Sequence, residues 1–566
     1  MRTMYLALVF VLALLVLAPL GANAQHQVRV PPYTGTNYIN DFIMGDSLST
    51  GQRRDSSAIY VLQRGQVYLA NAVTRNIGWT LTIVANDSTA GVSKPIVYLY
   101  PGGTSLLPPG QFVDMRGNLV MRNLIISGYF EPIPANLSGL QGAIINTTAP
   151  GLNMTIDSCL ITNTNGNHIR TDNAPKVVKI TNCVFANMGY LGKSNLGAGK
   201  AIDVRAGSVD SLIVVNNTFV NWQDRIIRHF SSTANLQYLR FEHNTCVNGM
   251  SYHGFLSLGK VGKQVIIRDN LLVDPFAAGQ DTDAVRQAEY IDSGEKDAFG
   301  FARMTWVISA PNDTTKWLVK NNYYRVTAAG QTFYDSASFI PIIANPALTK
   351  GSPLTYQINS KLGADSVNAF KTHTADLPNV PKLMTAMLKW YRAPFGALPD
   401  SGANKTKLNS MFRAKFDYDR RPIQYFRDTL NCAYATSNAV YTAGTGGYPV
   451  GDLNWFPAKL AQWKSDPVSS APSKGPEAPA GFALSQNYPN PFNPSTDISY
   501  TLPKASQVKI EVFDLLGRHV ATLLDGAVQA GTHSVRFDGT NLASGMYLYR
   551  LSVPGQVFTM KMMMLK

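Results

Sequence analysis

The chain has 566 residues, of which 45% are hydrophobic and 15% are charged, with 45 glycines and 32 prolines. This composition excludes a disordered chain, and the many turn-forming residues favour short strands over long helices. The formal net charge of +14 favours an anionic partner such as an acidic polysaccharide, while nucleic acid is not expected because no recognition motif of that kind is present.

Residues 1–24 have the three parts of a secretory signal peptide. Arg2 supplies the positive charge, residues 6–17 form an apolar run, and positions 22–24 read Ala-Asn-Ala, a small-residue cleavage site. The apolar run is shorter than the roughly 20 residues that a transmembrane helix needs. We therefore expect a mature chain that begins at Gln25 and has no transmembrane segment.

A repeated pattern organises residues 25–365, with a first strand expected near Tyr60. Seven segments share an apolar residue, two mostly polar residues, an Asn or Cys, and then alternating apolar residues. Their fourth positions are Asn123, Cys159, Cys183, Asn217, Asn244, Asn270 and Asn322. Most spacings lie between 24 and 36 residues, the length of one rung of a right-handed parallel β-helix, and the apolar residues lack the 3.6-residue period that helical repeats need.

The recurrent asparagines have a physical role in such a solenoid. One rung cannot bury its inner face alone, so stacked rungs supply the core, and an Asn at one position of each rung can bond to the next Asn and to turn backbone. A second series at the segment ends is expected to form a similar ladder: Asn163, Asn187, Asn221, Asn248 and Asp274. The cysteines are expected to be buried packing residues, although stacking of Cys159 on Cys183 would permit a disulfide.

Cationic side chains recur on neighbouring rungs. They are Arg170, Lys200, Arg205, Arg225, Arg228 and His229, with His253 one rung further along. Such a column could bind a carboxylated or sulfated glycan through bidentate arginine contacts, with Arg170, Arg225 and His253 as substrate-binding residues. The alternative is a solvated basic wall in which His229 is partly packed, and His168 is expected to lie in a turn.

Residues 217–229 read NTFVNWQDRIIRH. This stretch resembles the secreted β-helical polysaccharide lyases of the chondroitinase B and alginate lyase kind, in which an NTF strand is followed by an Arg-His pair. The resemblance implies β-elimination at a uronic acid, in which a base removes the proton α to a carboxylate that a cation or Ca²⁺ neutralises. On this hypothesis the catalytic residues are Arg228, His229, Lys200 and Arg205.

The sequence departs from that lyase pattern at two places. Arg205 stands where the lysine base is expected, and arginine stays protonated, so that Lys200 is the nearest substitute. Asp203 is the single acid where calcium ligands are expected. Paired carboxylates for glycoside hydrolysis, drawn from Asp203, Asp210 and Asp224, stay open as a further alternative.

A polar insertion interrupts the array between Asp274 and Trp306, and two segments without the repeat follow the array. The insertion contains acids that could hold Ca²⁺ or simply form a solvated loop: Asp281, Asp283, Glu289, Asp292, Glu295 and Asp297. Residues 366–464 are expected to pack on the β-helix as an extension or cap, because solenoid ends need cover. Residues 465–480, rich in Pro, Ser and Ala, have the composition of a linker.

Residues 481–566 are predicted to form a small Ig-like β-sandwich. Alternating strands such as QVKIEVFD and GMYLYRLSV are separated by turns. The motifs NYPNPFNP, VKIEVFDLLGRHV, GTHSVRFDGTNLASGMYLYRL and the terminal KMMMLK resemble the type A C-terminal sorting domain of the Bacteroidetes type IX secretion system. The resemblance implies contact with the type IX secretion machinery and a secreted or surface location, whereas an Ig-like adhesion module is the alternative.

Together these observations predict an exported all-β protein that binds or degrades an extracellular, acidic polysaccharide. A structural or adhesive surface protein without catalytic activity is the alternative.

Overall fold

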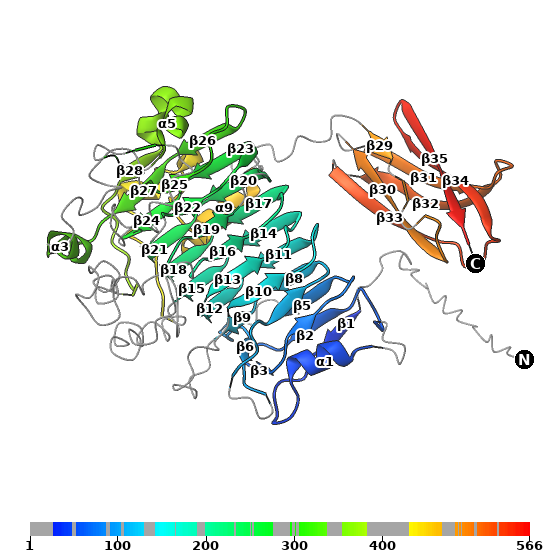
Figure 1. Ribbon diagram of the computed structural model, residues 1–566, viewed down its shortest axis with the longest axis horizontal. Helices are drawn as coiled ribbons and strands as arrows, with labels where there is room; N and C mark the ends of the chain where they lie inside the picture. The colour runs from blue at the N-terminus through cyan, green and yellow to red at the C-terminus, as the bar shows by residue number, and fades with distance from the viewer. Residues whose placement is uncertain are drawn as a thin grey trace, which may run out of the picture. The chain divides into compact units, whose positions relative to one another are not determined.

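The structure is a computed structural model, shown in Figure 1. It describes residues 26–47, 53–85, 91–102, 107–128, 142–164, 166–189, 199–230, 234–249, 251, 254–275, 295–296, 300, 305–336, 354–381, 429–466, 482–484, 486–487, 490–502, 506–528 and 531–565. The predicted signal peptide, most of the predicted linker, His253 and all the acids of the polar insertion except Glu295 lie outside these residues.

Three parallel sheets form the first part of the chain. Sheet 1 contains β1 (Gln27–Arg29), β2 (Ile59–Leu62), β5 (Leu81–Ala85), β8 (Leu119–Arg122), β11 (Asn153–Asp157), β14 (Val177–Thr181), β17 (Ser211–Val215), β20 (Leu236–Glu242), β23 (Val261–Arg268) and β26 (Lys316–Lys320). Sheet 2 contains β4 (Thr74–Arg75), β7 (Val113–Met115), β10 (Ala143–Thr147), β13 (Asn167–Thr171), β16 (Ile202–Val204), β19 (Ile227–His229), β22 (Leu256–Ser257) and β25 (Val307–Ile308). Sheet 3 contains β3 (Val67–Ala70), β6 (Ile96–Leu99), β9 (Ile125–Ser127), β12 (Leu160–Thr164), β15 (Val184–Met188), β18 (Thr218–Trp222), β21 (Thr245–Gly249), β24 (Leu271–Val273), β27 (Asn322–Arg325) and β28 (Phe370–Thr372).

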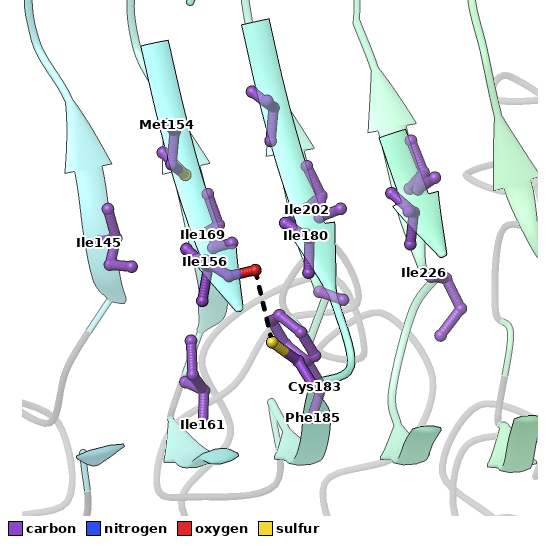
Figure 2. Close-up of a cluster of buried hydrophobic side chains, with 14 of the residues drawn as sticks. Ile145, Met154, Ile156, Ile161, Ile169, Ile180, Cys183, Phe185, Ile202 and Ile226 are labelled. Atoms are coloured by element: carbon purple, nitrogen blue, oxygen red, sulfur yellow. Dashed lines mark hydrogen bonds between the residues drawn. The ribbon is translucent and has the colours of Figure 1, made fainter. Parts of the chain in front are cut away.

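Each rung takes one strand from each sheet, and each strand pairs in parallel with its counterparts in the rungs before and after. Like residues therefore stack in columns, as Ile145, Ile169 and Ile202 do in sheet 2. Figure 2 shows this column beside Ile156 and Ile180 of sheet 1, and all five are buried. Stacking thus builds a core that no single rung could supply, and the predicted parallel β-helix is confirmed.

An asparagine ladder runs along the corner between sheets 1 and 3. The side-chain amide of Asn217 donates to Asn244 Oδ1 at 3.0 Å, Asn244 donates to Asn270 Oδ1 at 3.1 Å, and Asn270 donates to Asn322 Oδ1 at 2.7 Å. The same amides also donate to backbone carbonyls of the preceding rung, such as Ile180 O at 3.1 Å. The polar groups of the corner are thereby satisfied inside the protein.

The expected register of the first repeat is wrong by one residue. Ile156 pairs with Met121, so that Cys159 lies beside Leu124 and not beside Asn123. Asn123 occupies the neighbouring corner position, where the backbone is left-handed with φ of 60°. Asparagine is favoured at both corner positions, because it tolerates left-handed backbone at one and forms the ladder at the other. The two positions are therefore hard to tell apart in the sequence, which explains the error in register.

Cysteines replace asparagine in the earlier rungs of the same ladder. Cys183 Sγ lies 3.6 Å from Ile156 O, the contact that an asparagine amide makes in later rungs, and Figure 2 shows it. Cys183 Sγ in turn lies 3.4 Å from the backbone N of Cys159. All four cysteines are buried and free, as expected for packing residues.

The second predicted ladder is also present, at the end of the sheet 3 strands. Asn187 donates to Asn163 Oδ1 at 2.8 Å, Asn221 to Asn187 at 3.0 Å, and Asn248 to Asn221 at 3.3 Å. These asparagines and Asp274 have positive φ. The predicted ladder is therefore confirmed from Asn163 to Asn248, whereas Asp274 accepts hydrogen bonds from Thr327.

Short helices cover the two ends of the solenoid. Ile39 and Ile43 of α1 (Ile39–Gly45) join the core at the start of the solenoid. Ile358 of α5 (Tyr356–Leu362) joins it at the other end, beside the 3₁₀ helix η3 (Gly363–Asn368). The helix α3 (Ala328–Ser336) follows the last full rung.

Residues 429–460 cover the outer face of sheet 3. They contain the 3₁₀ helices η7 (Ala439–Tyr441), η8 (Thr445–Gly447) and η9 (Leu453–Trp455), and the helix α9 (Pro457–Ser465) begins at their end. Val220, Val247 and Val273 point outward from sheet 3 and pack against Cys432. This cover explains why β18 and β21 are buried along their whole length.

The chain divides into two compact units, Met1–Leu460 and Ala461–Lys566. The second unit contains a three-stranded sheet of β29 (Ala483–Leu484), β30 (Ser495–Leu502) and β33 (Gly531–Asp538). Its four-stranded sheet contains β31 (Ser506–Phe513), β32 (His519–Val528), β34 (Gly545–Val553) and β35 (Gln556–Met564). All pairs are antiparallel, and the two sheets share one core, as expected for a small β domain.

Candidate functional site

The outer face of sheet 2 carries a column of polar side chains in register. One residue of each strand contributes to it: Arg75, Asp114, Asn146, Arg170, Asp203, Arg228 and Ser257. The neighbouring positions in each strand point inward, because successive side chains of a strand alternate between its two faces. The column therefore crosses seven rungs on one face.

A second outward column lies two residues further along each chain segment. It contains Arg116, Thr148, Asp172, Arg205 and Phe230. The backbone register continues into it, since Arg205 N donates to Thr171 O at 3.0 Å and Phe230 N donates to Val204 O at 2.8 Å. Together the two columns form a surface that we call the arginine face.

Aspartates on the arginine face hold the arginines in place. Asp203 is buried and accepts bonds from Arg228 Nε at 2.6 Å and Nη2 at 3.1 Å, while Arg205 Nη1 lies 3.8 Å away. Arg170 Nε donates to Asp172 at 2.8 Å. Burial alone would raise the pKa of Asp172, but hydrogen bonds from Asn146 and Arg170 outweigh it and lower that pKa. The guanidinium groups are thereby oriented before any ligand arrives.

Four arginines of this face are open to solvent. The exposed fractions of the side chains are 48% for Arg75, 44% for Arg116, 37% for Arg170 and 40% for Arg205. At the end of the face, the ring of Phe230 is 55% exposed and lies 5.0 Å from the guanidinium carbon of Arg228. An anion or a sugar ring can therefore reach both kinds of group.

A second charged cluster lies next to this face but inside the protein. Lys200 Nζ lies 2.6 Å from Asp224 Oδ2, and Arg225 Nε donates to the same oxygen at 3.1 Å. Arg225 Nη1 donates to Ser257 Oγ at 2.7 Å. Burial lowers the pKa of Lys200 to about 8; Asp224 opposes this shift and Arg228 adds to it. The Lys200 side chain has no exposed surface, so a ligand on the outer face does not touch it.

Two histidines considered from the sequence point inward. His229 lies between the carbonyls of Leu258 at 3.2 Å and Gly207 at 3.1 Å, and burial lowers its pKa. His168 lies inside β13, so the expected turn position is wrong. Its ring stacks on Phe185 with 5.6 Å between centroids, and burial lowers its pKa to about 3. His168 is therefore a neutral core residue.

The structure thus divides the residues named from the sequence. Arg170, Arg205 and Arg228 share the arginine face, whereas Lys200 and Arg225 belong to the buried cluster. His229 packs inside the solenoid, and His253 lies outside the described residues. Asp203 is paired with Arg228, and Asp224 is paired with Lys200. Asp210 instead lines a separate pocket of about 370 Å³ with Lys176 and Gly207.

Sequence reasoning missed Arg75, Asp114, Arg116, Asp172 and Phe230. A signal was available in the spacing of charges, since positions 114–116, 170–172 and 203–205 read Asp-Met-Arg, Arg-Thr-Asp and Asp-Val-Arg. Two-residue spacing of opposite charges is what one face of a strand produces. The strands of sheet 2 are short, and their apolar positions alone did not reveal them.

A third cluster joins the solenoid to residues 429–460. Glu242, His243 and Asp269 lie close enough to share a metal ion. Arg268 Nη2, however, lies 2.8 Å from Glu242 Oε1, and the backbone N of Thr445 donates to Asp269 Oδ1 at 2.9 Å. Arg268 already supplies the positive charge that a metal ion would bring. We therefore interpret the cluster as a structural contact between the solenoid and residues 429–460.

The comparison with protein families concerns the second unit. Residues 486–565 match the secretion system C-terminal sorting domain. Neither a curated protein nor a solved structure matches the chain. The sorting domain marks a protein that type IX secretion exports to the cell surface or the extracellular space. Among the described residues, no helix has the length and apolarity to span a bilayer.

Proposed function

We propose that the β-helix binds an acidic extracellular polysaccharide along the arginine face. The observation that carries this proposal is the array of half-exposed arginines held in register by aspartates, which ends at an exposed phenylalanine ring. The secreted or surface location brings such a face into contact with extracellular glycans.

The geometry suits an extended anionic chain. Adjacent strands of a sheet lie about 4.8 Å apart, so the five strands from Arg75 to Arg205 extend over roughly 20 Å. Guanidinium groups bind carboxylate and sulfate through paired hydrogen bonds, and arginines that are already oriented lose little entropy on binding. Five arginines face three aspartates on this surface, so it keeps a positive balance. The ring of Phe230 can pack against the apolar face of a sugar.

The test uses purified protein and four glycans: alginate, pectate, chondroitin sulfate and a neutral glucan. We expect one of the acidic chains to bind, and Arg170→Ala and Arg205→Ala each to weaken binding about tenfold, the loss of one charge-assisted pair. Lys179→Ala is the matched control, because Lys179 is an exposed residue of β14 in the same rung, on sheet 1. Equal losses in all three variants would mean that net charge alone attracts the glycan.

Turnover by β-elimination is the second candidate. The observation that favours it is the pKa of Lys200, lowered by burial to about 8, since a base for proton abstraction needs a pKa near the working pH. Lys200 would have to leave Asp224 to reach a substrate. Unsaturated products that absorb in the ultraviolet, lost in Lys200→Met, would support an enzyme; absence of products together with glycan affinity would leave the binding function alone.

A further inference from the structure

The turn between β31 and β32 in the sorting domain is held rigidly. Asp514 Oδ1 accepts bonds from the backbone N of Leu516 and of Arg518, both at 2.9 Å, and its Oδ2 accepts one from Arg518 Nε at 2.6 Å. Backbone bonds join Asp514 N to Arg518 O at 3.1 Å and Gly517 N to Asp514 O at 3.0 Å. Gly517 has φ of 77°, the left-handed conformation that this turn requires.

This rigid turn displays two leucines to solvent. Leu515 is 63% exposed and Leu516 is 79% exposed, and they are the one adjacent pair among the exposed large hydrophobic side chains of the described residues. The turn is held by Asp514, Gly517 and Arg518, so polar side chains at 515 and 516 would serve its geometry equally well. Folding therefore does not account for the leucines.

We propose that the Leu515–Leu516 tip docks into an apolar socket on a protein of the type IX secretion machinery. The family match makes that machinery the partner that must recognise this domain. Arg518 is paired with Asp514 and His519 lies 3.8 Å from Glu511 Oε1, so the tip offers the partner apolar side chains and little net charge. The inference concerns export and does not rest on glycan binding by the β-helix.

The experiment uses the full chain, produced in a bacterium that has type IX secretion, with the periplasmic and exported fractions measured by immunoblot. We expect the double variant L515S/L516S to lose at least nine-tenths of its export and to accumulate in the periplasm. L515M/L516M keeps the tip apolar and should be exported normally. V557S is the matched control, because Val557 is a similarly exposed apolar residue of β35 in the same domain, at 62%.

Several results would overturn the proposal. Normal export of L515S/L516S would show that the tip is not needed. Loss of export in L515M/L516M would show that the machinery does not recognise the tip by its apolar character. Thermal melting of each variant tests folding, and a melting temperature for L515S/L516S well below that of V557S would assign the loss to instability. A changed oligomeric state with unchanged export would make a second copy of this chain the occupant. Glycan affinity of any exported variant is expected to equal that of the unaltered protein.

Discussion

Replacing Asn244 by alanine tests whether the corner ladder stabilises the solenoid. Asn244 is fully buried, and its side chain takes part in four hydrogen bonds. It donates to Val214 O at 3.0 Å and to Asn270 Oδ1 at 3.1 Å, and it accepts from the backbone N and the side-chain amide of Asn217 at 3.1 and 3.0 Å. Alanine removes all four.

The cost follows from the groups left without these partners. The Asn217 amide still donates to Ile180 O, and Asn270 Oδ1 still accepts from Asn244 N, so these two groups stay bonded. Asn217 N and Val214 O lose the bond to the side chain of residue 244. A buried polar group without a partner costs about 1–3 kcal/mol, and Asn217 N is that group, because Val214 O also lies in the parallel pairing of β17 with β20. Asn244→Ala should therefore lower the free energy of unfolding by about 1–3 kcal/mol.

Urea unfolding followed by circular dichroism measures this change, and Cys183→Ala is the matched control. Cys183 occupies the same ladder position, but its thiol forms weaker sulfur contacts, at 3.4 Å to Cys159 N, 3.6 Å to Ile156 O and 3.1 Å to Thr181 O. Its loss should cost about 1 kcal/mol, the value of one small buried apolar group. A loss for Asn244→Ala no greater than that for Cys183→Ala would refute the reasoning.

Three further predictions concern charge and the arginine face. Burial raises the pKa of Asp452 to about 7, although a hydrogen bond from Thr218 Oγ1 at 2.7 Å opposes the shift. The folded state therefore keeps a proton on Asp452 that the unfolded state releases near pH 4. Stability should therefore fall as pH rises from about 4 to 7, by at most about 4 kcal/mol, and Asp452→Asn should abolish this slope in unfolding experiments. Phe230→Ala should weaken glycan binding by about 1 kcal/mol, roughly fivefold, in titration calorimetry, and an unchanged affinity would remove the ring from the site. Lys200→Met should lower the free energy of unfolding by about 3 kcal/mol, because it leaves Asp224 with one charged partner fewer in a buried cluster, and wild-type stability would contradict that role.

The fold was predictable because its determinants repeat. Every rung needs an asparagine or a substitute at the corner, and apolar residues inside, so the period of the solenoid appears directly in the chain. The error at Asn123 arose where two neighbouring corner positions favour the same residue, and only the register with Met121 separates them. The sorting domain was predictable for a different reason, since its motifs are long and occur in a fixed order.

The candidate site was only partly predictable, because the direction of a side chain depends on which strand it lies in. Arg228 and His229 are neighbours in the chain, yet the first bonds to Asp203 on the outer face and the second packs between carbonyls inside. Which of two neighbouring side chains points outward cannot be decided from the sequence until the bounds of the strand are known. Lys200 shows the same limit, since its burial against Asp224 joins two segments of different rungs.

The repeat that builds the solenoid also explains why a binding face can arise on it. The inner columns must stay apolar for the rungs to stack, but the outer column of sheet 2 is free of that demand and can carry alternating charges. Asp203 contacts Arg205 of its own rung and Arg228 of the next, and Asp114 contacts Arg116 of its own rung and Arg75 of the preceding one. Orientation of one arginine thus depends on the adjacent rung, and we expect Asp203→Asn to weaken glycan binding by freeing both guanidinium groups. The same alternation would extend over more rungs in a longer solenoid, so under the proposed function the length of the arginine face would set the length of the bound glycan.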